Sequence, residues 1–297
     1  MRLAVLTSLL VTVAATAAAD GPVGRIVYGG ITDEGMSVYI VNADGRRHAQ
    51  LAKHGANPRW LPDGSGVIVG PRLVDPDTGA STEFPTDHGV SDVSPDGQWY
   101  ATLGSGLAAG VATREVATYR ADGSEYRVLT ELDLGQLNSL EWAPDGRSLL
   151  VAARIGGGNR IYVIDAEDGA AVAMLPDGEE GYDAHWSADG GSIYYIGDRG
   201  GLRRVDVVDR SMHVIDRWFA GHLFAVSPDG KYLLSESPWE GQADLAAFDL
   251  SGVFVSRITD HEALPRRADW FIPRHLLPVS PVRTRAMTWG MLRDGVE

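Results

Sequence analysis

The chain has 297 residues, of which 44% are hydrophobic and 8% aromatic, so it is long enough to bury a large core as a folded globular protein. Its formal net charge is -14, which argues against nucleic acid or an anionic membrane as a partner, because both need clustered basic side chains. It contains no cysteine, which excludes disulfides and thiolate metal sites.

The first predicted element is a secretory leader over residues 1–19. Arg2 gives a positive start, Leu3–Val13 is apolar, and Ala17–Ala19 supplies small residues at the cleavage position. The apolar run is too short to span a membrane comfortably. The sequence therefore predicts cleavage before Asp20 and a protein that is periplasmic or extracellular and not inserted in the membrane.

The rest of the chain repeats one turn pattern. A tryptophan or valine is followed two residues later by Pro-Asp-Gly, or in one copy by Ala-Asp-Gly. The five clear copies place their aspartates at Asp63, Asp96, Asp145, Asp189 and Asp229. A sixth, degenerate copy has Trp270 and carries Pro273 at the aspartate position. Turn formation alone explains proline, aspartate and glycine at these places, so we interpret the five aspartates as structural.

A second turn signal alternates with the first and follows strands such as YVID. Its six copies end at Gly45, Gly79, Gly123, Gly169, Asp209 and Gly252. Two hairpins in each repeat of about 40–45 residues give four strands, which is typical of a β-propeller blade. The sequence predicts an all-β fold over residues 20–280, a six-bladed propeller with seven blades as the alternative, followed by a tail over residues 281–297.

The order of the two signals predicts how the ring closes. Residues 25–30 (RIVYGG) open the first repeat without the tryptophan-type strand that begins the other repeats. The strand at Trp270, in contrast, has no repeat of its own. We therefore expect this C-terminal strand to join the N-terminal blade as its innermost strand.

The segment WAPDGRSLLVAARIGGGNRIYVIDAEDG, residues 142–169, resembles the PD40, or WD40-like, propeller repeat of the TolB C-terminal type. The resemblance covers residues 24–280 and implies the same propeller fold. TolB itself has an α/β domain before its propeller, whereas here the propeller is expected about four residues after the cleavage position. Because propellers serve as binding modules and as enzymes, the resemblance implies a fold and leaves the function open.

Familiar catalytic motifs are missing from the sequence. It has no nucleophile elbow, phosphate loop, dinucleotide fingerprint or zinc-protease helix. Gly104–Gly110 is rich in glycine, but neither a helix nor a lysine follows, so we interpret it as a loop between strands. The unusual feature is a set of histidines before the inner strands of five repeats: His54, His88, His185, His222 and His261.

Acidic residues occupy the same connections as these histidines, namely Asp92, Glu141, Asp183 and Asp269. The connections are expected at one mouth of the central channel, where side chains from every blade can meet. We predict that this mouth is the functional surface.

Two functions fit these residues. The preferred one is a monomeric, non-catalytic binding module without a cofactor, which recognises a protein or glycan through one face or the channel. The alternative is a metal-dependent polysaccharide lyase or hydrolase whose channel histidines hold a divalent metal, similar to oligogalacturonate lyase, another PD40 propeller. The histidines precede the tryptophan or valine by unequal offsets of 6, 5, 1, 4 and 9 residues, which favours the first function. The acidic net charge also favours it, because it would repel an acidic polysaccharide.

Overall fold

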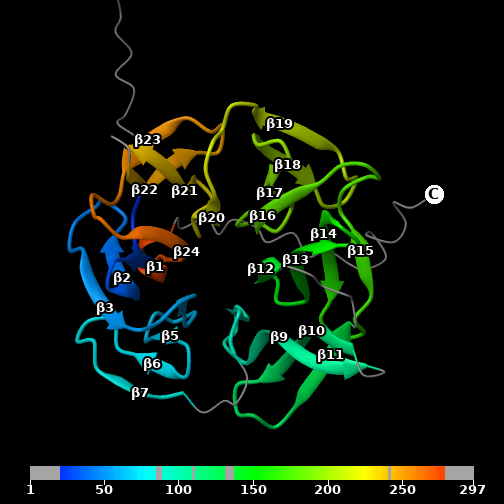
Figure 1. Ribbon diagram of the computed structural model, residues 1–297, viewed down its shortest axis with the longest axis horizontal. Helices are drawn as coiled ribbons and strands as arrows, with labels where there is room; N and C mark the ends of the chain where they lie inside the picture. The colour runs from blue at the N-terminus through cyan, green and yellow to red at the C-terminus, as the bar shows by residue number, and fades with distance from the viewer. Residues whose placement is uncertain (1–20, 85–88, 109–110, 131–136, 240–241, 278–297) are drawn as a thin grey trace, which may run out of the picture.

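Six four-stranded antiparallel sheets form a ring in the computed structural model (Figure 1). It describes residues 21–84, 89–108, 111–130, 137–239 and 242–277, so the predicted leader and tail lie outside the described residues. The all-β, six-bladed prediction is confirmed, and the seven-bladed alternative is wrong. Within the described ranges, no helix is long and apolar enough to cross a bilayer.

Blades two to six each run from the innermost to the outermost strand in chain order. Blades two and three are β4 (Arg59–Trp60), β5 (Val67–Val69), β6 (Arg72–Val74), β7 (Ser81–Glu83), and β8 (Asp92–Val93), β9 (Trp99–Ala108), β10 (Val111–Arg120), β11 (Tyr126–Thr130). Blades four and five are β12 (Leu137–Trp142), β13 (Ser148–Ile155), β14 (Gly158–Asp165), β15 (Ala171–Ala173), and β16 (Gly181–Trp186), β17 (Ser192–Gly197), β18 (Leu202–Asp206), β19 (Met212–Asp216). Blade six is β20 (Leu223–Val226), β21 (Tyr232–Trp239), β22 (Gln242–Asp249) and β23 (Phe254–Arg257).

Blade one joins the two ends of the chain. Its strands, from the inside outward, are β24 (Leu264–Phe271), β1 (Arg25–Thr32), β2 (Gly35–Asn42) and β3 (Ala49–Lys53). β24 pairs with β1, with Trp270 opposite Ile26, and the indole nitrogen of Trp270 donates to the Val23 carbonyl at 2.8 Å. The predicted closure by the C-terminal strand is confirmed. It removes the two free edges that an open ring would leave.

The repeated turn closes itself through its aspartate. Asp96 accepts a hydrogen bond from the Gln98 amide at 2.9 Å, and Asp189 accepts one from the Gly191 amide at 3.0 Å. The remaining three make the same contact with the amide two residues on, at Ser65, Arg147 and Lys231. Successive turns lie close together. A Cβ atom added to Gly146 would be 3.7 Å from Cδ of Pro95 in the previous turn. The aspartates therefore shape a row of turns.

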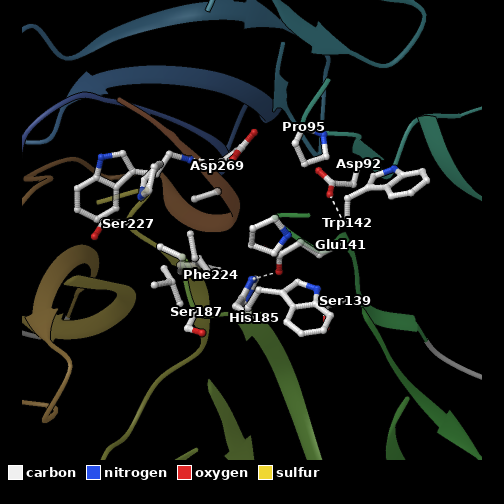
Figure 2. Close-up of a pocket in the computed structure, with 18 of the residues that line it drawn as sticks. Asp92, Pro95, Ser139, Glu141, Trp142, His185, Ser187, Phe224, Ser227 and Asp269 are labelled. Carbon is white, nitrogen blue, oxygen red and sulfur yellow. Dashed lines mark hydrogen bonds and ion pairs between the residues drawn. The ribbon is translucent and has the colours of Figure 1, made fainter. Parts of the chain in front are cut away.

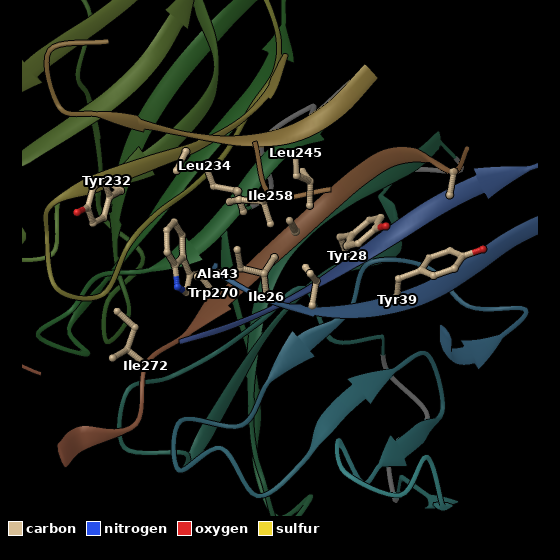
Figure 3. Close-up of a cluster of buried hydrophobic side chains, with 14 residues drawn as sticks. Ile26, Tyr28, Tyr39, Ala43, Tyr232, Leu234, Leu245, Ile258, Trp270 and Ile272 are labelled. Carbon is tan, nitrogen blue, oxygen red and sulfur yellow. The ribbon is translucent and has the colours of Figure 1, made fainter. Parts of the chain in front are cut away.

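The repeated tryptophan fills the space between neighbouring blades. Its four copies are 2–6% exposed: Trp60, Trp142, Trp186 and Trp270. The ring of Trp60 in blade two lies 5.2 Å from Phe271 of blade one, and Trp270 lies 6.4 Å from Tyr232 of blade six. Figure 3 shows the second of these interfaces, where residues near both chain ends share one core with blade six.

The Gly-rich stretch departs from the loop interpretation. β9 continues to Ala108 and β10 begins at Val111, and these two residues pair with each other. The loop expected over Gly104–Gly110 is therefore wrong for residues 104–108. The physical reason is that ladder hydrogen bonds join main-chain groups, so a long hairpin can extend through glycines that offer no side chain to pack.

Candidate functional site

A cavity of about 440 Å³ lies among the inner strands of the ring (Figure 2). All six inner strands contribute to its lining: β4, β8, β12, β16, β20 and β24. Three prolines of the repeated turns line it as well: Pro95, Pro144 and Pro228. The cavity lies in the central channel, whose mouth is the predicted functional surface.

One position of the repeat supplies a side chain from every blade. It directly precedes the tryptophan or valine, and because side chains alternate along a strand, it faces the channel while its neighbour faces the next blade. We call these six residues the channel ring: Arg59, Asp92, Glu141, His185, Ala225 and Asp269. Three carboxylates oppose one guanidinium, which leaves a formal charge of -2 when the imidazole is neutral.

Two carboxylates of the channel ring cap the inner strand of the next blade. Asp269 Oδ2 accepts from the Trp60 amide at 2.7 Å, and Asp92 Oδ2 accepts from the Trp142 amide at 2.6 Å. The Arg59 guanidinium donates to the Ser91 carbonyl at the start of blade three. These bonds hold the ring side chains in fixed positions around the cavity.

His185 continues the same pattern. Its Nδ1 lies 3.1 Å from Glu141 Oε2 of blade four, and its Nε2 lies 3.2 Å from the Leu223 carbonyl of blade six. The imidazole thus stands between two acceptors from the flanking blades. The imidazole can donate to one of these acceptors from its N–H, and its position between them places blade five beside blades four and six.

The three ring carboxylates outnumber the nearby cations, which are Arg59 in the ring and the partly buried Arg267 that interacts with it. Burial raises the pKa of Asp92 to about 7, the Arg59 guanidinium 3.7 Å away opposes this shift, and the charges of Glu141 and Asp269 add to it. Burial also raises the pKa of Asp269. Asp92 exposes only 18% of its side chain. The cavity therefore holds more acid than it neutralises, which is an arrangement that stabilises a bound cation.

Two further polar pairs lie outside the channel ring, one between β16 and the residue before β20, the other between β24 and β21. His222 Nδ1 is 2.7 Å from Asp183 Oδ2, and Arg266 is 3.8 Å from Glu236. The hydrogen bond with Asp183 raises the pKa of His222. Asp183 has a φ of 48°, in the left-handed region that aspartate tolerates better than most residues. The pairing of Asp183 with His222 joins blades five and six.

The predicted histidines lie in different surroundings. His185 belongs to the channel ring, and His222 pairs with Asp183. His261 lines a separate cavity formed by blade one and the connection from β23 to β24, and His54 is exposed on the connection from β3 to β4. His88 lies outside the described residues. In the part of the chain that the structure describes, no group of three or more His, Cys, Asp or Glu side chains can hold a metal ion.

Arg59 is the charged ring member that the sequence interpretation misses, and the uncharged Ala225 is missed as well. The signal that identifies Arg59 is nevertheless present, because the position before the tryptophan or valine reads Arg, Asp, Glu, His, Ala and Asp in chain order. Polar residues at one offset of a repeat face one channel, whereas histidines at unequal offsets lie at different heights.

Solved structures with similar folds support the propeller assignment. TolB from Acinetobacter baumannii aligns with a TM-score of 0.69 at 18% identity, over 83% of this chain and 66% of that chain. A nidogen/laminin complex aligns at 0.64 and 12% identity, over 82% and 97%. Oligogalacturonate lyase from Vibrio parahaemolyticus aligns at 0.55 and 12% identity, over 81% and 77%. No protein-family model and no curated protein sequence matches this chain. At these identities the likeness shows the fold alone, a TolB-type β-propeller.

Proposed function

We propose that the protein is a non-catalytic binding module whose channel ring takes a cationic side chain of a partner protein. The observation that carries the proposal is the excess of acid in the channel ring, where Asp92, Glu141 and Asp269 outnumber the Arg59 guanidinium even with the partly buried Arg267 counted as a second cation near it. A guanidinium or ammonium group entering the cavity would restore the balance. Burial strengthens this attraction, because the surroundings screen charges less than water does.

The size and wall of the cavity fit this role. About 440 Å³ accommodates one long side chain or a short peptide segment and is too small for a folded domain. Ring members Asp92, Asp269 and His185 are held by neighbouring blades, so the site is preformed and loses little entropy on binding. With the leader expected over residues 1–19, we propose that the module meets its partner outside the cytoplasm.

Titration calorimetry with N-acetyl-arginine amide tests the proposal. We expect millimolar or tighter binding, and at least tenfold weaker binding of the neutral isostere N-acetyl-citrulline amide. Asp92→Asn and Asp269→Asn should each weaken arginine binding severalfold while the fold is retained. Glu83→Gln removes the same charge from the exposed strand β7 and should leave binding unchanged.

Equal binding of the arginine and citrulline probes would contradict the proposal, as would ring variants that bind like Glu83→Gln. Binding should also strengthen from pH 6 to pH 8, because Asp92 must lose its proton to pair with a cation. Equal arginine binding at both pH values would show that Asp92 does not pair with the bound cation.

The alternative, a metal-dependent lyase, has no grouping of ligands in its favour among the described residues. Metal analysis of the purified protein separates the two functions directly. A stoichiometric transition metal that disappears in His185→Ala would move the protein into the enzyme class.

A further inference from the structure

A second cavity, of about 900 Å³, lies beside the seam where the chain ends close the ring. It is bounded by the turn from β1 to β2, the connection from β2 to β3 and the connection from β23 to β24. We call it the seam cleft, and its functional side chains are Asp33, Glu34, Tyr39, His48, His261 and Glu262. None of them belongs to the channel ring, so the seam cleft is a separate site.

Four rings lie against one another from the core of blade one to this cleft, with His261 tilted against Tyr39 and His48. The centroids of His48 and His261 are 4.7 Å apart, and Tyr39 lies 5.0 Å from His261 and 5.6 Å from His48. Tyr28 is fully buried behind them, 5.4 Å from Tyr39 (Figure 3). The two half-exposed imidazoles therefore form an aromatic wall with a fixed position.

Hydrogen bonds lock the tautomer of each imidazole. The Ala263 amide donates to His261 Nδ1 at 3.0 Å, so Nδ1 carries the lone pair and Nε2 carries the proton. The Tyr28 hydroxyl lies 2.6 Å from His48 Nε2 and has no other hydrogen-bond partner among the described residues. A buried hydroxyl donates its proton where it can, and burial raises the pKa of Tyr28, so it stays protonated. His48 then carries its own proton on Nδ1.

The fixed tautomers of His48 and His261 determine which ligand groups these imidazoles can bind. Both lone pairs are already used, so neither His48 nor His261 can ligate a metal without breaking an internal bond. Each ring instead offers one N–H, and neither N–H has a hydrogen-bond partner in the described part of the chain. Two donors beside an aromatic surface call for a ligand with acceptor oxygens.

The rim of the cleft restricts the charge of that ligand. Asp33, Glu34 and Glu262 are exposed around the imidazoles and carry no compensating ion pair in the described residues. An anionic ligand would be repelled by all three carboxylates. The same carboxylates accept hydrogen bonds from hydroxyl groups, so the ligand needs donors as well as acceptors.

We propose that the seam cleft binds a neutral saccharide. Its hydroxyl oxygens accept from the N–H groups of His48 and His261, and its hydroxyl protons go to the rim carboxylates. One apolar face of the sugar ring packs on the imidazole wall, as apolar groups pack on aromatic surfaces. The site goes beyond the channel ring in both place and chemistry, and it selects against acidic sugars.

The tautomers can be tested without any ligand. Long-range ¹H–¹⁵N correlation of the imidazoles at pH 7.5 should show the Nδ1–H form for His48 and the Nε2–H form for His261. Tyr28→Phe removes the hydroxyl while keeping the ring and should release His48 into the mixture of tautomers found in free histidine. A mixture at both positions in the unsubstituted protein would overturn the proposal.

Saturation-transfer NMR and calorimetry with maltotriose, cellotriose and chitotriose test the ligand class. We expect at least one neutral sugar to bind with a millimolar or lower Kd, and trigalacturonate to bind at least tenfold more weakly than that sugar. His261→Phe keeps the ring, removes the N–H and should weaken the neutral sugar at least fivefold. His213→Phe, on the exposed outer strand β19, is the matched control and should bind normally.

Failure of all three neutral sugars to bind overturns the proposal. So does trigalacturonate binding as tightly as a neutral sugar, or His261→Phe binding like His213→Phe. Because the arginine probe reports on the channel ring and the sugars report on the seam cleft, the two proposals fail independently.

Discussion

At the scale of single residues, the channel ring combines two roles that oppose each other. Asp92 accepts the Trp142 amide and so ties blade three to blade four, which stabilises the ring. The same carboxylate is buried beside two other acids, which makes its charge costly. A residue that is destabilising when charged and alone, yet held firmly in place, is typical of a site arranged for a ligand.

The pH dependence of stability exposes this cost. The folded-state pKa of Asp92 is about 7, whereas an unfolded aspartate titrates near 3.9, so the folded state holds a proton that the unfolded state has released between these values. Stability from this group therefore falls as the pH rises through that window, by at most about 4 kcal/mol. Asp92→Asn keeps an oxygen for the Trp142 amide and removes the titration.

Urea denaturation at pH 5, 6, 7 and 8 measures the effect. Asp92→Asn should gain stability relative to the unsubstituted protein as the pH increases, and the gap should be widest at pH 8. Parallel pH profiles for the two proteins would show that the ring does not strain this carboxyl.

The pair formed by Asp183 and His222 offers an independent titration. The Asp183 hydrogen bond is the main cause of the raised pKa of His222. Asparagine tolerates the left-handed φ of 48° at position 183, so Asp183→Asn removes the charge without straining the backbone. The His222 pKa measured by NMR should then fall toward its ordinary value near 6.5. A titration curve that does not move would mean that the pair is not formed in solution.

At the scale of elements, the turns are where the sequence is most informative. Pro-Asp-Gly dictates a local backbone geometry, so the hairpins and blades follow from it without knowledge of the tertiary structure. The extent of β9 through Ala108 does not follow, because it depends on pairing with β10. Site residues depend on tertiary structure in the same way. The sequence places His222 and His261 in equivalent connections, yet one meets Asp183 and the other meets His48.

Alanine substitutions in two outer turns with the same backbone conformation distinguish the stability cost of turn strain from the cost of disturbed packing between blades. Gly123 and Gly169 have φ values of 76° and 73°. A Cβ on Gly123 would meet nothing within 4 Å, whereas one on Gly169 would lie 2.0 Å from the main-chain oxygen of Leu129 in the neighbouring blade. Gly123→Ala should cost about 1 kcal/mol from strain alone. Gly169→Ala should cost about 3 kcal/mol, because the Leu129 main chain must also move.

Thermal and urea denaturation of the two variants measure these costs. Equal losses would mean that blades three and four can separate slightly at their outer rim without penalty. Such a result would place the cohesion of the ring at its inner strands.

At the scale of the whole molecule, the inner strands form a nearly closed circuit. Ring side chains link blade one to two through Asp269, two to three through Arg59, three to four through Asp92, and four to five to six through His185. The position that would link blade six to blade one is Ala225, which has no polar group. That last junction therefore depends on β24 and on the core around Trp270.

This dependence makes the closing strand the critical element of a ring that has no disulfide to hold it. Deleting residues 264–297 removes β24, Trp270 and the Asp269 carboxylate that caps blade two. It exposes the edge of β1 and unpacks both interfaces of blade one, so we expect loss of cooperative unfolding near neutral pH. Deleting residues 278–297 removes none of the described strands and serves as the control, with a Tm expected within a few degrees of the full chain.

A circularly permuted chain tests whether the 264–297 deletion acts through the loss of strand β24 or through the changed position of the chain end. It begins at Leu264, joins Phe271 to Arg25 through a Pro-Asp-Gly turn, and ends at Ala263, so blade one acquires the connection that the other blades already have. Because all six inner strands are then present, cooperative unfolding should return with a Tm close to that of the full chain. If the 264–297 deletion melts like the full chain, or if the permuted chain fails to fold while the 278–297 deletion folds, closure by β24 does not hold the ring together.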